Sequence, residues 1–137
     1  MNNKSEENFK DVLDEQRHVT ENVTELCRYI SFGILATCYA LFTSDAVFAK
    51  KILENNQNWI LASALSASLA IASDYLQFLA GYVSVRKALK NKKGNFNYDP
   101  DSRSQKFRYG LFIMKQILVT TSVLFFVYFL YSTLNSQ

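Results

Sequence analysis

Three stretches of the chain are almost free of charged residues, and polar, charged segments separate them. Residues 29–44 contain no charge, and beyond Asp45 the apolar character continues to residue 48. Residues 59–85 contain one charge, Asp74, and residues 109–134 contain one, Lys115. Helices of this length are roughly 24 to 40 Å long, enough to cross the hydrocarbon core of a bilayer. The pattern predicts an all-α integral membrane protein with three transmembrane helices, over residues 29–48, 59–85 and 109–134.

A water-soluble helical bundle is the alternative to this interpretation. The chain has 137 residues, 49% of them hydrophobic, with one proline and four glycines. Outside the three runs only about 60 residues remain, and they are too few and too charged to cover three almost wholly apolar helices. Trp59 and Tyr109 stand at the starts of two runs, where aromatic rings prefer the headgroup boundary. The composition therefore favours membrane helices.

Basic residues are distributed unevenly among the segments that connect the runs. The N-terminal segment and the basic segment 86–108 together contain twelve lysines and arginines, whereas residues 49–58 contain only Lys50 and Lys51. Three crossings place the N-terminus and the basic segment on the same side. Because short loops rich in Lys and Arg remain in the cytoplasm, we expect a multi-pass protein of the plasma (inner) membrane, with a cytoplasmic N-terminus and an extracytoplasmic C-terminus.

Residues 1–28 form an acidic cytoplasmic segment with a regular apolar pattern of its own. Steps of three and four residues separate the members of this heptad seam, and its one polar member is of the kind that fixes register in coiled coils. The seam comprises Phe9, Val12, Gln16, Val19, Val23, Leu26 and Ile30. It predicts a helix that runs directly into the first span. Either the seam joins copies of the chain in an oligomer, or the helix folds back on the basic segment of its own chain.

Asp74 is the one charge of the second run, and its side of the helix is unlike the others. At 100° per residue, small or polar residues gather on one side and leucines on the other. This polar face comprises Ser63, Ala67, Ala70, Asp74, Gln77 and Gly81. A charge at this depth costs on the order of 3 kcal/mol, so a partner is expected, and Lys115 is the candidate for an ion pair. Asp74 then either holds the helices together or lines a polar path across the membrane.

Residue types used in catalytic and metal centres are few and scattered. The chain has one histidine, His18, and two cysteines, Cys27 and Cys38, at a separation that fits no metal motif. No nucleophile–base arrangement or glycine-rich phosphate loop is present. We therefore predict no enzymatic activity, no cofactor and no metal, and we expect both cysteines to be small buried thiols. The basic segment is expected to contact lipid headgroups or an anionic cytoplasmic ligand, and no nucleic-acid partner is expected.

The layout resembles that of small multi-span membrane effectors of bacterial anti-phage defence systems, such as two-span domains that associate with nucleotide second-messenger enzymes. The resemblance covers an N-terminal cytoplasmic helix, a helical hairpin over residues 29–85 and the basic segment after it. The third run departs from the two-span pattern. The resemblance implies an oligomeric, channel- or pore-like assembly that damages or depolarises the membrane. The other expectation is an accessory or anchoring subunit that recruits a cytoplasmic protein through its N-terminal helix.

Overall fold

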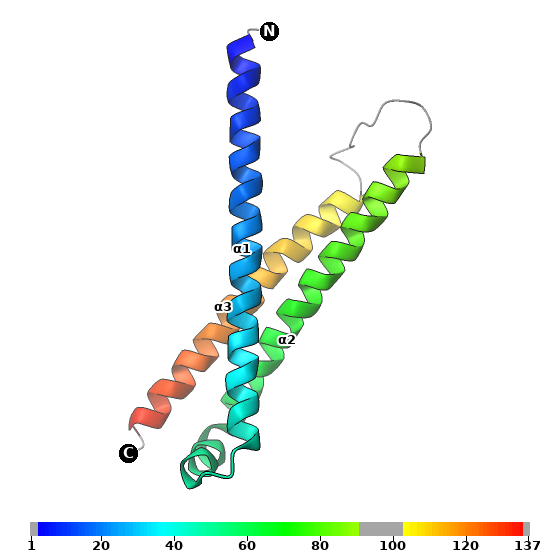
Figure 1. Cartoon of the computed structure of the whole chain (residues 1–137). Coiled ribbons are helices and arrows are strands. Elements are labelled where there is room, and N and C mark those ends of the chain that lie inside the picture. The colour runs from blue at the N-terminus through cyan, green and yellow to red at the C-terminus, as the bar shows by residue number, and fades with distance from the viewer. Residues whose placement is uncertain (1–2, 91–102, 136–137) are drawn as a thin grey trace.

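The computed structural model describes residues 3–90 and 103–135, and within these ranges the chain is helical and contains no strand. It forms α1 (Asn3–Thr43), α2 (Val47–Lys90) and α3 (Arg103–Asn135) (Figure 1). Each of the three helices contains a stretch that is long and apolar enough to cross a membrane. The all-helical fold and the three long apolar helices predicted from the sequence are therefore confirmed.

The chain turns between α1 and α2 at residues 44–46, earlier than the sequence predicts. The first span was expected to continue to residue 48, but α1 ends at Thr43, and Val47 begins α2. The hydroxyl of Ser44 accepts a hydrogen bond from the backbone N–H of Ala46 at 3.3 Å, and the Ala46 carbonyl accepts from the N–H of Lys50 at 3.1 Å. Serine side chains compete with helical hydrogen bonds in this way, which explains the early end of the helix.

The other helix ends also differ from the predicted boundaries. α1 is continuous from Asn3, so the acidic N-terminal segment and the first apolar run belong to one helix of 41 residues, as the heptad seam predicts. α2 continues to Lys90 and α3 begins at Arg103, so part of the basic segment 86–108 is helical. Residues 91–102, the middle of that segment, lie outside the described residues.

α2 and α3 pack against each other along most of their length and run in opposite directions (Figure 1). Steps of three, four or seven residues separate the buried side chains, as in a coiled coil. On α2 they include Ala49, Ile52, Asn56, Ile60, Ser63, Ala67 and Ala70, and on α3 they include Leu111, Lys115, Val119, Ser122 and Phe129. Many of the buried residues of α2 are small, which lets two helix backbones approach closely.

Polar contacts fix the register of this antiparallel pair. The hydroxyl of Ser63 donates to the Ser122 carbonyl at 2.9 Å, and the hydroxyl of Ser122 donates to the Ser63 carbonyl at 2.8 Å. Nearer the C-terminus of α3, the amide of Asn56 donates to the hydroxyl of Thr133 at 3.4 Å. Buried polar groups favour a single alignment because sliding the helices would leave these groups without partners.

α1 crosses this pair and contacts it through its C-terminal half. Ser31, Ile34 and Cys38 are buried there, and the Cys38 thiol donates a weak hydrogen bond to the carbonyl of Ile60 at 3.8 Å. Toward its N-terminus α1 stands apart from α2 and α3 (Figure 1). The fold is thus a two-helix unit with a third helix that packs at one end and projects at the other.

Candidate functional site: an ion cluster beside an open groove

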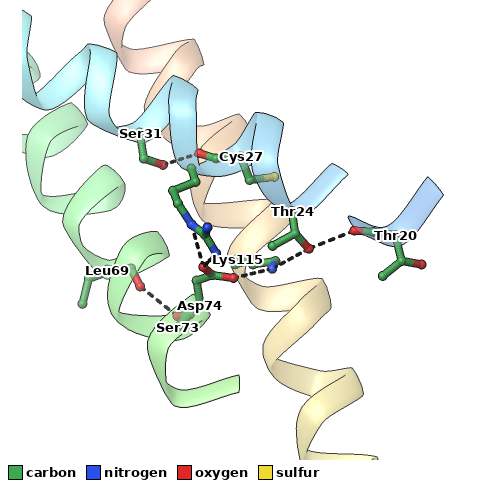
Figure 2. A network of polar contacts seen from close by, with 9 residues as sticks. Thr20, Thr24, Cys27, Ser31, Leu69, Ser73, Asp74 and Lys115 are labelled. Atoms are coloured by element: carbon green, nitrogen blue, oxygen red, sulfur yellow. Dashed lines mark hydrogen bonds and ion pairs between the residues drawn. The ribbon is translucent and has the colours of Figure 1, made fainter. Parts of the chain in front are cut away.

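Asp74 lies where the three helices meet, and each of the other two helices brings a cation to it. The Arg28 guanidinium of α1 donates through Nη2 to Oδ2 of Asp74 at 2.6 Å and through Nε at 3.2 Å. Lys115 of α3 donates through Nζ to Oδ1 of Asp74 at 2.7 Å (Figure 2). Each carboxylate oxygen therefore has its own cationic partner, and the cluster ties all three helices together.

Lys115 is enclosed by its partners, although its charge lies deep in an apolar helix. Its side chain is 1% exposed. Besides Asp74, Nζ donates to the hydroxyl of Thr24 at 3.0 Å, and that hydroxyl donates to the Thr20 carbonyl at 2.9 Å (Figure 2). The ammonium also lies 5.3 Å from the centre of the Phe112 ring, within the range of a cation–π contact. The lysine is thus fully enclosed within the protein.

The ion pair expected between Asp74 and Lys115 is present, whereas the contact of Arg28 with Asp74 was not expected from the sequence. Arg28 is one of the twelve basic residues whose distribution predicts the orientation. The available signal was its place as the last charge before an uncharged run. Its side chain is 41% exposed and that of Asp74 is 16% exposed, so the cluster opens to its surroundings on the Arg28 side. Two cations and one carboxylate give the cluster an excess positive charge.

The polar face predicted on α2 divides into two parts. Ser63, Ala67 and Ala70 are buried within the chain, where Ser63 bonds to α3. Asp74 belongs to the ion cluster, and Gln77 and Gly81 line a groove together with it. The small-residue part is therefore already occupied by contacts inside one chain, and only the part from Asp74 onward faces open space.

The groove has a volume of about 920 Å³ and lies between the N-terminal half of α1 and the C-terminal half of α2, with one residue from α3. The lining residues include Gln16, Arg17, Glu21, Glu25, Arg28, Asp74, Gln77, Phe78, Gly81, Tyr82, Val85 and Arg108. Two buried polar atoms, Gln77 Oε1 and Arg108 Nε, have no hydrogen-bond partner among the residues that the structure describes. The groove is thus open, it combines charged side chains with apolar surface, and two of its polar atoms have no partner among the described residues.

The heptad seam of α1 lies beside the strip of residues through which α1 contacts α2 and α3, and the two overlap only in part. Val12 is 66% exposed, Val19 49% and Leu26 59%; Ile30 is also exposed, and Val23 is half-buried. Gln16 lines the groove, and the side chain of Phe9 lies outside the described side chains. The residues of α1 that contact the other helices are Thr24, Cys27, Ser31, Ile34 and Cys38. The first three directly follow seam positions in the sequence, and the last two continue at steps of four residues from Ile30. The seam is therefore uncovered along most of its length.

The residues considered for redox or metal chemistry lie apart. Cys38 is buried as expected, Cys27 is only half-buried, and both are free thiols. His18 is exposed on α1, with its Nε2 3.2 Å from the side-chain amide of Asn22. Across residues 3–90 and 103–135 no three histidine, cysteine or acidic side chains gather as metal ligands would.

No protein-family model, curated protein or solved structure matches this chain. The functional conclusion therefore depends on the geometry of the helices, the ion cluster and the groove.

Proposed function

We propose that this chain inserts into the plasma membrane through its three helices and assembles there with copies of itself through α1. The distribution of basic residues supports a cytoplasmic N-terminus and an extracytoplasmic C-terminus. In this orientation the projecting part of α1 and the open groove lie at the cytoplasmic end of the molecule. The α2–α3 pair is the membrane anchor, and α1 is the element through which the anchor is joined to others.

The uncovered heptad seam is the observation that carries this proposal. Val12 and Val19 are exposed on a helix segment that also carries Asp14, Glu15 and Arg17. These charges keep the segment out of the hydrocarbon core, so lipid does not cover the two valines. Apolar side chains at heptad spacing in water are stabilised by packing into the seam of another helix.

A second copy of α1 suits this seam. The positions that flank it are Asn8, Leu13, Glu15, Thr20, Asn22, Cys27 and Tyr29, of which only Glu15 is charged. Two parallel copies therefore bring few like charges together, and the Gln16 amides of the two copies face each other at the same level. Because every copy enters the membrane with the same orientation, their α1 helices are parallel by necessity.

Charged substitution of the seam is expected to dissociate the assembly. We expect Val12→Lys together with Val19→Lys to weaken association by at least about tenfold, because paired lysines would lose water inside the seam. Both side chains are exposed in the single chain, so its helices and stability should remain unchanged. The measurement is the mass of the protein in detergent or nanodiscs by light scattering, with His18→Lys, an exposed position outside the seam, as the matched control.

Two outcomes would count against self-assembly. An unchanged mass for the Val12/Val19 variant would show that the seam does not hold the copies together. A monomeric wild-type protein would favour the other function expected from the sequence, an anchoring subunit whose seam binds a helix of a cytoplasmic partner.

Ion conduction by the assembly is the second candidate, favoured by the groove that leads from the α1–α2 opening to the ion cluster. On the N-terminal side of Asp74, α3 covers the polar face of α2. A path for ions across the membrane would therefore have to form between copies of the chain. The excess positive charge of the cluster favours anions. Such an assembly would depolarise the membrane, as the resemblance to anti-phage effectors implies.

Liposome flux measurements test this second candidate. We expect chloride release to exceed potassium release several-fold with wild-type protein, because the cluster carries more cations than carboxylates. The Val12→Lys, Val19→Lys variant, reconstituted at the same density, should release neither ion. Absence of flux from wild-type liposomes in which the oligomer is present would exclude conduction and leave assembly intact.

A further inference from the structure

Among the residues that the structure describes, Arg108 is the cation of the groove for which no ion pair is found. Of the other cations that line the groove, Arg17 is 3.3 Å from Glu21, and Arg28 is 2.6 Å from Asp74. Glu25 also lies close enough to Arg28 to interact with its charge, although no ion pair joins these two described residues. The Arg108 guanidinium has no such partner among the described residues, and its buried Nε–H has no acceptor.

A second unsatisfied atom lines the same groove, one helical turn from the contact between Arg108 and α2. The Arg108 guanidinium lies against the backbone of Gly81, where an added Cβ would be 3.5 Å from Arg108 Cζ. Gln77 is one helical turn before Gly81, and its buried Oε1 lacks a donor. A ligand that satisfies both atoms needs an anionic acceptor for Arg108 and a hydrogen-bond donor beside it for Gln77.

The rim of the groove is apolar, so a ligand that fills the groove needs an apolar part as well as an anionic one. Phe78, Tyr82 and Val85 line it from α2, and all three are exposed. They lie within the last turns of the stretch Asn56–Arg86, the part of α2 that is apolar enough to cross a membrane. Aromatic residues at the end of a span lie at the level of lipid headgroups. An acyl chain can follow this strip outward from the groove, whereas a soluble anion would leave it uncovered.

From these features we propose that the groove binds the headgroup of a phospholipid. The phosphodiester accepts hydrogen bonds from Arg108, and a hydroxyl or ammonium group beside it donates to Oε1 of Gln77. The acyl chains extend along Phe78, Tyr82 and Val85. The inference rests on the membrane insertion proposed above, but it does not depend on association between copies.

Lipid binding to the detergent-purified full chain tests the proposal. We expect phosphatidylglycerol and phosphatidylethanolamine to be retained in native mass spectra and to raise the melting temperature more than phosphatidylcholine, whose choline group has no N–H or O–H donor. Arg108→Gln should weaken the binding of both lipids by about tenfold or more, because a charge-assisted hydrogen bond is lost. Gln77→Leu should retain binding but remove the preference over phosphatidylcholine.

Controls separate this site from general effects. Arg86→Gln removes an exposed basic residue at the end of the same span and should leave lipid retention unchanged. Membrane fractionation of each variant checks insertion, and circular dichroism checks the helices. A variant that fails to insert or to fold is therefore distinguished from one that has only lost lipid binding. The proposal is overturned if Arg86→Gln and Arg108→Gln reduce retention equally, if neither does, or if glycerol 3-phosphate stabilises the protein as strongly as the lipids.

Discussion

Replacing Asp74 with asparagine is expected to destabilise the folded chain by about 3 kcal/mol or more, because a buried cation loses its counter-ion. Lys115 is 1% exposed and 2.7 Å from the carboxylate that the substitution removes. Arg28 loses its partner as well, but its exposed side chain can turn toward water. The free energy of unfolding in mixed micelles containing increasing SDS, followed by circular dichroism, measures the loss.

A second substitution shows whether charge is the cause. Lys115→Met in the Asp74→Asn background should restore most of the lost stability, since no unmatched charge then remains buried. Lys115→Met alone should cost much less than Asp74→Asn, because Asp74 keeps its contact with Arg28 at 2.6 Å. Equal losses for the two single variants, or a double variant as unstable as Asp74→Asn, would contradict the arrangement of two cations around one carboxylate.

Enlarging Ala67 is expected to separate α2 from α3. This side chain is completely buried, one turn from Ser63, where the helices exchange hydrogen bonds with Ser122. Ala67→Leu inserts three carbon atoms into this close contact and should cost about 1 to 3 kcal/mol or more. The same unfolding measurement in mixed micelles reports the loss.

The matched control for this variant is Ala72→Leu. Ala72 is exposed on the same helix, so its replacement should change stability by less than about 0.5 kcal/mol. If Ala67→Leu were tolerated as well as Ala72→Leu, the close approach of α2 and α3 at this level would be wrong.

The helices and the Asp74–Lys115 pair could be predicted from the sequence because each follows from the cost of placing a group in lipid. Long uncharged runs have few alternatives to membrane helices. Charges within them are so unfavourable that two of opposite sign, one on each of two neighbouring runs, are expected to meet. The heptad seam could also be predicted, because its spacing depends only on the sequence of α1 and not on how the helices pack.

The partners of the polar face and of Arg28 could not be predicted, because they depend on how the helices pack. A row of small residues indicates that some helix approaches closely, but it does not distinguish α3 of the same chain from another copy. Ser63 and Ala67 meet α3. Likewise, the level that Arg28 reaches depends on how α1 crosses α2, and no local pattern in the sequence encodes that crossing.

The cluster of two cations around Asp74 also has a consequence for the order in which the chain is made. If the chain inserts into a membrane as proposed, α1 enters the bilayer first, then α2 and last α3, so Asp74 reaches the bilayer before Lys115 does. During this interval Arg28 of α1 is already available to pair with the carboxylate, whose burial in hydrocarbon without a partner would be costly. When α3 inserts, Lys115 meets a carboxylate that Arg28 has already paired. Arg28, which appears redundant in the finished fold, would thus neutralise Asp74 in the α1–α2 hairpin until α3 has left the ribosome.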